Sequence, residues 1–262
     1  MPQRLKLLLC YQGTRYHGWQ IQEQEASPRT IQGVLEEAFY RLTGKNVRLT
    51  ASGRTDAGVH ALGQVAHCDV PPCSIQNWQM SLNAVLPKDI RVLSAEEVPQ
   101  EFHARFSAQH KTYLFAFWTE RRFVPPHRAP FVWACGDLDL DPMRAFLPYL
   151  VGEHDFASLQ NTGSNVRSTI RRILEADLIL LPHNPYLPGH APEFCFKVTA
   201  TGFLKQMVRN ICGILAALGK HRLTVDAACA ILHEKQRAAN PCRTAPAQGL
   251  TLACVSYDAF TP

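Results

Sequence analysis

SGRTDAGVHA, residues 52–61, lies between two segments that have the pattern of β-strands. Residues 47–51 before it alternate apolar and polar side chains, and residues 64–70 after it form a second short strand. The stretch is too polar for a core, so we expect a turn between the two strands. Gly53 and Gly58 can adopt backbone angles that are closed to other residues, which allows a tight bend and the close approach of a ligand.

The polar residues inside this turn exceed what a turn needs. A tight turn requires glycine and a small polar residue, but it does not require the sequence Arg-Thr-Asp of residues 54–56. An aspartate carboxylate can act as a nucleophile, provided that a nearby cation compensates its burial. We therefore take Asp56 as a candidate nucleophile. The alternative, that Asp56 only caps the turn through its own backbone, stays open at this point.

Two arginines are candidates for the compensating cation. Arg54 is adjacent in the loop, and Arg209 lies in residues 203–218, the strongest helical pattern of the chain. Lys205 and Arg209 fall four residues apart on the side opposite the apolar stripe, where a solvated helix face is the alternative. Tyr113 is in an aromatic strand, and is either a core tyrosine or a side chain that stacks on a base.

The composition of the 262-residue chain is that of a soluble globular protein, with 46% hydrophobic and 19% charged residues. Its length allows one large domain or two lobes with a shared core. No apolar run approaches the roughly 20 residues that a membrane-spanning helix requires. The first 13 residues predict a strand and not a signal peptide. These features predict a cytoplasmic protein without a membrane partner.

Cysteine usage and charge give two further expectations. Nine cysteines occur at irregular spacing without a Cys-x-x-Cys motif, which favours reduced, mostly buried thiols over a disulfide framework. The net charge of +5 lies wholly in residues 105–262, because residues 1–104 hold ten basic and ten acidic side chains. A one-sided excess of this kind suits a polyanionic partner.

Familiar cofactor and metal motifs are missing from the sequence, including the phosphate-binding loop, GxGxxG after a strand, HExxH and GxSxG. The nearest metal-like group is His60, His67, Cys68 and Cys73. Since neighbouring residues of a strand point to opposite faces, His67 and Cys68 do not easily share an ion. The sequence therefore predicts no metal and no cofactor, and favours chemistry by side chains alone or binding without chemistry.

The first half predicts the order βαββαβ. The expected elements are a strand over residues 5–11, a helix between Thr30 and Gly44, strands over 47–51 and 64–70, a helix over 74–86 and a strand from Ile90.

The second half repeats this order, without a repeat in the sequence itself. The expected elements are a strand over residues 111–118, a helix over 141–150, strands near 168–181 and 194–201, helices over 203–218 and 225–233, and a strand over 250–257. The proline-rich segment Pro182–Glu193 predicts a surface excursion. We therefore expect an α+β protein of two ferredoxin-like halves, residues 1–104 and 105–262, which share one continuous sheet.

Motifs along the whole chain resemble the tRNA pseudouridine synthase A family. In order they are YQGTRYHGWQ (11–20), TIQGVLEEA (30–38), SGRTDAGVHA (52–61), FHARFSA (102–108) with KTY (111–113), GEHDF (152–156), FLKQMVRN (203–210) and TAPAQGL (244–250). Several independent motifs in the same order make coincidence very unlikely. The segment from Lys235 to Thr244, with Pro241 and Cys242, departs from the more regular structure that we expect there.

The resemblance implies a role for five residues. Asp56 is the nucleophile, and Arg209 pairs with it. Tyr113 stacks on the target uracil and takes part in proton removal from C5. Leu250 packs under the pocket, and Arg54 holds the target nucleotide out of the stack.

Thr55, His60 and Lys205 are further candidates for substrate binding. The resemblance also implies the pseudouridine synthase fold, with a mixed, largely antiparallel sheet and an active-site cleft between the halves. It implies a homodimer without metal or cofactor, which isomerises uridine in the anticodon stem-loop of tRNA at positions 38–40.

Two alternatives to such an enzyme stay open. The first is a tRNA-binding or chaperone protein that kept the fold and lost catalysis, although the intact Asp56, Tyr113 and Arg209 argue against it. The second is an unrelated hydrolase with an aspartate nucleophile and a magnesium ion.

Overall fold

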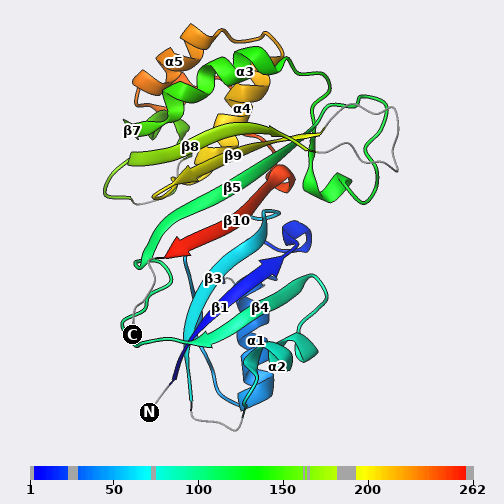
Figure 1. Cartoon of the computed structure of the whole chain (residues 1–262), viewed down its shortest axis with the longest axis vertical. Coiled ribbons are helices and arrows are strands. Elements are labelled where there is room, and N and C mark those ends of the chain that lie inside the picture. Colours follow the sequence, from blue (N-terminus) through cyan, green and yellow to red (C-terminus); the bar gives the residue numbers. More distant parts are fainter. Residues whose placement is uncertain are drawn as a thin grey trace. The chain divides into compact units, whose positions relative to one another are not determined.

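The computed structural model describes residues 3–22, 29–71, 75–161, 163, 166–181 and 193–257. The chain divides into two compact units. Figure 1 shows the helices and strands, coloured along the sequence from blue to red. The first unit contains the chain up to Gln109 and from Thr251 onward, and the second unit is His110–Leu250. This division differs from the expected one after residue 104, because the closing strand returns to the first unit.

The first unit contains the neighbouring strands β4, β1, β3 and β10. β1 (Gln3–Tyr11) pairs antiparallel with β3 (His60–Val70) and β4 (Ile90–Glu97). The short β2 (Thr50–Ala51) also pairs antiparallel with β3. β10 (Leu250–Tyr257) pairs with the start of β3 in parallel. The strand expected over residues 47–51 is thus reduced to its last two residues.

Helix α1 (Ile31–Thr43) has the predicted boundaries. The Thr30 side chain accepts a hydrogen bond from the Gly33 amide, which satisfies a donor of the first turn. Gly44 follows the helix with a φ of 66°, the left-handed conformation that glycine adopts without penalty. Leu35 and Phe39 of this helix are fully buried.

Helix α2 (Trp78–Val85) packs against α1 and β4. It begins later than the expected residue 74, because the Asn77 side chain accepts a hydrogen bond from the Met80 amide and caps the helix there. The order β1, α1, β2, β3, α2, β4 confirms the βαββαβ order predicted for this half.

The second unit contains the strands β5, β9, β8 and β7 in this order, each antiparallel to its neighbour. Their bounds are Ala108–Trp118 (β5), Phe194–Ala200 (β9), Ile170–Leu180 (β8) and Gly152–Asp155 (β7). A two-residue strand, β6 (Trp133–Ala134), pairs with the end of β5. The sequence did not predict β6 or β7, which are too short for an alternating pattern.

Three helices complete the second unit: α3 (Leu140–Phe146), α4 (Met207–Gly219) and α5 (Val225–His233). Helix α4 is almost wholly buried and packs against α3. It begins at Met207 and not at the expected residue 203, because Gln206 has a left-handed φ of 59°. Short 3₁₀ turns lie at Gly13–Arg15, Ala129–Phe131, Leu147–Leu150, Ala157–Leu159, Arg237–Ala239 and Ala247–Gly249.

The predicted α+β class is confirmed. The eight cysteines in the described part of the chain are free thiols, as the sequence predicts, but only three of the eight are buried, so the expectation of mostly buried thiols is wrong. Burial raises the pKa of the Cys212 thiol well above its ordinary value. Of the helices that the structure describes, none has the length and apolar character needed to cross a bilayer. Cys73 and residues 182–192 of the expected surface excursion lie outside the described residues.

His67, on β3, is held in the neutral state. Burial lowers its pKa to about 4, and the charges of His103 and Arg4 act in the same direction. Its Nδ1 accepts a hydrogen bond of 3.1 Å from the Ala104 amide, which requires an unprotonated nitrogen. Ala104 is fully buried, so this bond connects the segment after β4 to the sheet.

We expect His67 to make the protein less stable in mild acid. The unfolded chain protonates this residue near pH 6.5, whereas the folded chain does so only near 4. The contribution of the neutral ring is therefore complete above pH 6.5 and is lost as the pH falls from 6.5 to about 4. The free energy of unfolding in urea should fall by about 1–2 kcal/mol between pH 7 and pH 5. In His67→Gln, which keeps an acceptor but does not titrate, the fall should be smaller; an equal fall would contradict this account.

Candidate active site

The Asp56 loop, residues 52–59, connects β2 to β3 in the first unit. Its first residue is fixed to the sheet, because the Ser52 amide donates to the Val65 carbonyl at 2.8 Å. Its last residues form a turn in which the Val59 amide donates to the Asp56 carbonyl at 3.1 Å. Gly58 has a φ of 80°, so the turn uses the backbone freedom that the sequence predicts for it. Asp56 is half-buried in this turn.

The segment after β1, residues 12–20, lies against this loop. The Trp19 amide donates to the Thr55 carbonyl at 3.0 Å, and the Gly58 amide donates to the Tyr16 carbonyl at 3.3 Å. These two bonds hold the backbone on both sides of Asp56. Two motifs that the sequence shows as separate loops are therefore one structure.

Two glycines of that segment permit this close approach. A Cβ atom on Gly13 would lie 2.0 Å from the Val59 carbonyl oxygen. A Cβ atom on Gly18 would lie 2.6 Å from the Thr55 carbonyl oxygen, and Gly18 also has a φ of 84°. Neither position has room for a side chain, because the obstacle in both cases is backbone.

A buried hydrogen-bond network supports the Asp56 loop. The hydroxyls of Tyr11 and Thr55 lie 2.8 Å apart, and the Gln64 amide group donates to the Tyr11 hydroxyl at 3.4 Å and to the Gly53 carbonyl at 2.9 Å. The Ser52 hydroxyl donates to the Gln64 side-chain oxygen at 2.8 Å. Burial raises the pKa of Tyr11 to about 12, so its hydroxyl stays protonated and can donate.

The other predicted residues of this loop differ in exposure. Arg54 is exposed, whereas Thr55 is 6% and His60 2% exposed. The Nδ1 of His60 accepts a hydrogen bond of 3.1 Å from the Gly13 amide. Because Thr55 and His60 are buried and bonded to the neighbouring segment, the geometry favours a supporting role for both over direct contact with a substrate.

We expect Tyr11→Phe to weaken the Asp56 loop. The change leaves the buried Thr55 hydroxyl and one Gln64 donor without this partner, which costs about 1–3 kcal/mol. Urea unfolding should report this loss, and the catalytic rate should fall with it. The matched control is Tyr40→Phe, since Tyr40 is 54% exposed and its change should stay within about 0.5 kcal/mol. Equal stability of the two variants would contradict the role of the network.

Tyr113 lies in the second unit, on β5, and is 8% exposed. Its ring meets the ring of Phe203 edge to face, with centroids 5.1 Å apart. Phe203 precedes helix α4 and is half-buried. Tyr113 is therefore packed and has a small accessible part. This is compatible both with a core tyrosine and with a side chain that stacks on a base.

Arg209 lies in the first turn of α4 and is fixed by Ala245. Its Nε donates to the Ala245 carbonyl at 2.8 Å, and the Ala245 amide donates to the Arg209 carbonyl at 3.1 Å. This pair of bonds sets the direction of the guanidinium, which contradicts the alternative of a solvated helix face. Lys205 is exposed and precedes the helix, so the four-residue helical spacing expected for it is wrong.

A group of hydrogen-bonded polar side chains holds the segment before Ala245 in place. The sequence did not indicate this group. Asn210, which is fully buried, donates to the Leu159 carbonyl at 2.7 Å and accepts from the Thr244 hydroxyl at 2.7 Å. Arg237 donates to the Asn161 side chain at 2.8 Å and to the Asn240 carbonyl at 2.7 Å. The segment from Lys235 to Thr244 is irregular apart from one 3₁₀ turn, and these bonds fix it to α4.

Leu250 is 6% exposed, and the glycine before it lies close to an aromatic ring. A Cβ atom on Gly249 would lie 2.6 Å from the ring of Phe115, two residues along β5 from Tyr113. The turn before Leu250 is thus seated on the aromatic strand. Asp56 belongs to the first unit, and Tyr113, Arg209 and Leu250 belong to the second. The pairing of Asp56 with Arg209 stays a prediction.

Among the residues that the structure describes, no group of three or more His, Cys, Asp or Glu side chains could hold a metal ion. His60 and His67 instead accept hydrogen bonds from backbone amides.

Comparison with known proteins gives the family of the chain. The family model described as tRNA pseudouridine synthase matches residues 9–107 and 147–258. Two proteins named tRNA pseudouridine synthase A, from Nitratidesulfovibrio vulgaris strain Miyazaki F and Maridesulfovibrio salexigens, are 48% and 46% identical to it. Their matches cover 97% of this chain in both cases, and 99% and 90% of their own lengths.

The protein of that name from Lawsonia intracellularis is 45% identical, over 98% of this chain and 100% of its own length. These matches extend over nearly the whole chain and include both the Asp56 loop and helix α4. The chain therefore belongs to the tRNA pseudouridine synthase family and is an isomerase that converts uridine to pseudouridine in tRNA.

Proposed function

We propose that this isomerase acts in the cytoplasm on uridines of the anticodon stem-loop, at tRNA positions 38–40, with Asp56 as the nucleophile. The observation that supports the nucleophile most is the attachment of its loop. Thr55, the preceding residue, is bonded through its carbonyl to Trp19 and through its hydroxyl to Tyr11. Asp56 is therefore presented from a fixed backbone while its own side chain stays half-exposed.

The first step is extrusion of the uridine from the folded arm, because no side chain can reach its ring within the stack. Unstacking costs a few kcal/mol, which aromatic stacking and phosphate contacts offset. Arg54 is proposed to hold the nucleotide out of the stack, and its exposure in the same loop as Asp56 supports this role. Tyr113 stacks on the extruded uracil.

The isomerisation then exchanges one bond for another. The Asp56 carboxylate adds to C6 of the uracil or to C1′ of the ribose, and the bond between N1 and C1′ breaks. The uracil turns within the pocket, and a new bond forms between C5 and C1′. The proton on C5 leaves to a base, for which Tyr113 is the candidate, and the Asp56 carboxylate is released. The pocket must be closed during the reaction, because a uracil that escaped from it would leave an abasic site.

Arg209 is proposed to pair with the Asp56 carboxylate. A guanidinium presents a planar set of donors that suits a carboxylate, and its plane is set here by the Nε bond to Ala245. Leu250 is proposed to pack under the pocket, and Lys205 to contact the RNA backbone.

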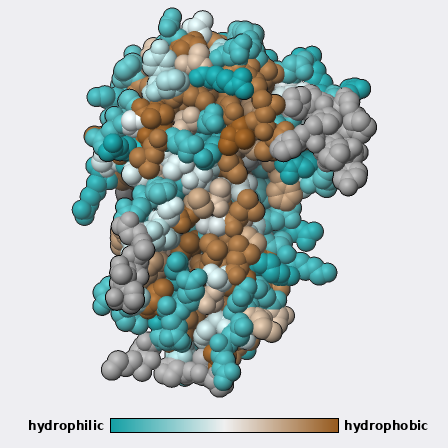
Figure 2. All heavy atoms as spheres, in the orientation of Figure 1, coloured by the Kyte–Doolittle hydropathy of each residue, from teal (hydrophilic) through white to brown (hydrophobic). Residues whose placement is uncertain are grey.

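We also propose that the protein is a homodimer. Apolar side chains are exposed on β8, among them Ile170 at 52%, Leu174 at 44% and Leu180 at 50%. Figure 2 shows apolar residues, in brown, on the face of the molecule in view. Exposed apolar surface of this kind is typical of an interaction site. Light scattering in solution measures the mass directly, and a mass of 29.4 kDa would contradict the dimer.

Tritium release from tRNA labelled at C5 of uridine tests the proposed function, because the C5 proton is lost only when the base is rejoined through C5. Release and pseudouridine at positions 38–40 are expected. A protein that binds tRNA without release would be the inactive RNA-binding alternative. Activity that persists in a chelator would exclude the magnesium-dependent hydrolase.

Mapping pseudouridine in tRNA from cells with and without the gene gives the positions. Loss at positions 38–40 alone is the expected result. Loss at other positions would contradict the assignment to the anticodon stem-loop while leaving the isomerase activity intact.

A further inference from the structure

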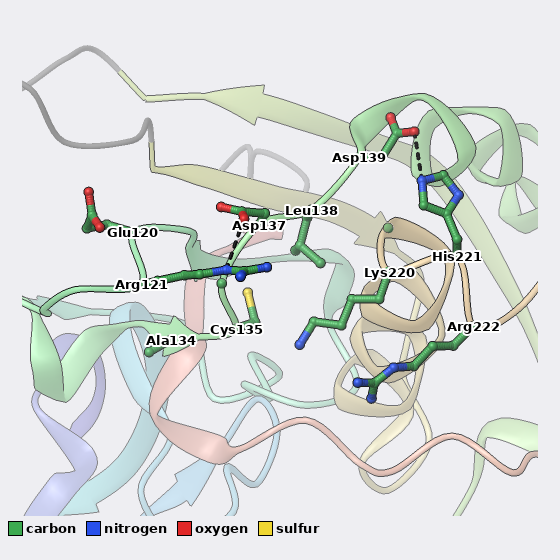
Figure 3. A pocket seen from close by; sticks show the side chains of 12 residues that line it. Glu120, Arg121, Ala134, Cys135, Asp137, Leu138, Asp139, Lys220, His221 and Arg222 are labelled. Carbon is green, nitrogen blue, oxygen red and sulfur yellow. Dashed lines mark ion pairs between the residues drawn. The ribbon is translucent and has the colours of Figure 1, made fainter.

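Helix α4 carries Arg209 in its first turn and is fixed at its other end. There the Asp139 amide donates to the Gly219 carbonyl at 2.9 Å. The His221 ring lies 3.2 Å from the Asp139 carboxylate, beside the hollow shown in Figure 3. A Cβ atom on Gly219 would lie 2.8 Å from the Met143 sulfur, so α3 and the end of α4 meet without space for a side chain. The backbone of α4 is therefore a fixed base, and the direction of the Arg209 guanidinium depends on the contacts of its side chain.

Residues 243–245 lie directly on the first turns of α4. A Cβ atom on Gly213 would lie 2.1 Å from the Arg243 carbonyl oxygen, so the backbones of the helix and of this segment are in contact. Gly213 follows Arg209 by four residues, which places both on the same face of α4. Arg209 bonds both the amide and the carbonyl of Ala245. The segment therefore supplies the acceptor that fixes the Arg209 Nε.

Thr244 connects the same segment to the helix a second time, through its side chain. Its hydroxyl donates to the Asn210 side-chain oxygen at 2.7 Å. Asn210 is fully buried, and its amide group donates to the Leu159 carbonyl at 2.7 Å, so Asn210 is itself held in place. Consecutive residues of the helix, 209 and 210, thus bond consecutive residues of the segment, 245 and 244.

The chain before Thr244 has little regular structure that could hold it independently. Between Lys235 and Thr244 the structure has one 3₁₀ turn, Arg237–Ala239. The Nη2 of Arg237 lies 3.5 Å from the Thr244 hydroxyl, which is longer than an ordinary hydrogen bond. The short bond to Asn210 is therefore the stronger restraint on Thr244, and a shift there reaches the Ala245 carbonyl across one residue.

We propose that Thr244 is a positioning residue for Arg209, because its hydroxyl bond to Asn210 holds the Ala245 carbonyl that fixes the guanidinium. The proposal rests on the proposed pairing of Arg209 with the Asp56 carboxylate. Thr244 acts only through Arg209. A shift of about 1 Å in a group that acts in the reaction can reduce the rate about 100-fold, so the loss of one hydroxyl affects turnover without affecting tRNA binding.

Two variants separate the hydroxyl of Thr244 from its shape. Thr244→Val removes the hydroxyl and keeps the branched side chain, whereas Thr244→Ser keeps the hydroxyl. Thr43→Val is the matched control, because Thr43 is also half-buried and its hydroxyl donates to the Phe39 carbonyl at 2.8 Å in the first unit. Single-turnover tritium release, tRNA binding by fluorescence anisotropy and urea unfolding are measured for each variant.

Thr244→Val should release tritium about 10- to 100-fold more slowly than the unchanged protein. Its affinity for tRNA should stay within about twofold, as should the rates of Thr244→Ser and Thr43→Val. Should Thr244→Val not fold, Thr244→Ala takes its place with the same expected results. A full rate in the folded variant without the hydroxyl would overturn the proposal.

A double-mutant cycle tests whether Thr244 acts through Arg209. In the Arg209→Gln background, Thr244→Val should cause no further loss of rate, because no guanidinium is left to position. Its effect on unfolding should be the same in both backgrounds, because the bond between Thr244 and Asn210 does not involve the Arg209 side chain. Rate losses that multiply would show a general structural role and overturn the proposal. A full rate in Arg209→Gln alone would overturn it together with the pairing.

An NMR measurement tests the same contact without the use of activity. The Nε–H signal of Arg209 is assigned from its absence in Arg209→Gln. Its exchange with solvent should be about tenfold faster in Thr244→Val than in the unchanged protein and in Thr244→Ser. Equal exchange in all three would overturn the proposal. Failure of the proposed function is a different result: the unchanged protein then releases no tritium, and the exchange rates still show whether Thr244 holds Arg209.

Discussion

Asp56→Asn should remove turnover while leaving the fold intact. Asparagine has the same shape, but its amide cannot form the covalent bond to the uridine that the mechanism needs. Removal of a nucleophile costs about 10⁴-fold or more in rate. Tritium release under single-turnover conditions should therefore fall by at least that factor, and tRNA binding should persist.

The stability of this variant is its control. The hydrogen bonds that hold the loop use the Asp56 carbonyl and the neighbouring Thr55, and neither changes. The free energy of unfolding should stay within about 0.5 kcal/mol. A variant that unfolds more easily by several kcal/mol would show that Asp56 serves the structure. Retained turnover would contradict the nucleophile directly.

Gly13→Ala should have the next largest effect. The new methyl group would lie 2.0 Å from the Val59 carbonyl oxygen, so the Asp56 loop or the segment after β1 must move. Overpacking of this kind costs about 3 kcal/mol or more when the obstacle is backbone. A shift of about 1 Å in a catalytic group can reduce the rate about 100-fold. We expect both losses, in urea unfolding and in tritium release.

Gly44→Ala separates displacement of the loop from a general loss of stability. Gly44 has a positive φ, of 66°, and its added Cβ would meet nothing within 4 Å, whereas at Gly13 the obstacle is the Val59 carbonyl. The cost should be about 1 kcal/mol of backbone strain, without an effect on kcat. Similar rate losses in the two variants would contradict a specific role for the contact between Gly13 and Val59.

Local chemistry made parts of the fold predictable. The ends of α1 follow from Thr30 and Gly44, whose hydrogen bond and backbone angle act within four residues of the helix. The bounds of α5 and β10 agree with the predicted ranges for a similar reason, since each has a clear period. Elements of two to four residues, such as β6 and β7, carry no period and were missed.

Contacts between distant residues explain the other errors. Helix α4 begins late because Lys205 and Gln206 are held outside it: the Asn161 amide donates to the Lys205 carbonyl at 3.2 Å, and the Asn161 side chain bonds Gln206. No residue near position 206 in the sequence indicates the late start of α4, because the start depends on contacts with the distant Asn161.

The same distinction applies to the site. Asp56 could be found from its motif, because the glycines around it indicate a turn and the polar residues exceed what a turn needs. Its supports could not be found, because Tyr11 bonds Thr55 across 44 positions of the chain and Ala245 bonds Arg209 across 36. The sequence marked residues 11–20 and 244–250 as motifs without showing what they touch.

The central claim is that the Asp56 carboxylate forms a covalent bond with the target uridine. The most direct measurement uses tRNA with 5-fluorouridine at the target positions, because fluorine at C5 blocks the final proton loss. Mass spectrometry of the trapped complex should find the nucleotide on the peptide that contains Asp56, and no adduct in Asp56→Asn. An adduct on another residue, or a blocked enzyme without any adduct, would contradict the claim.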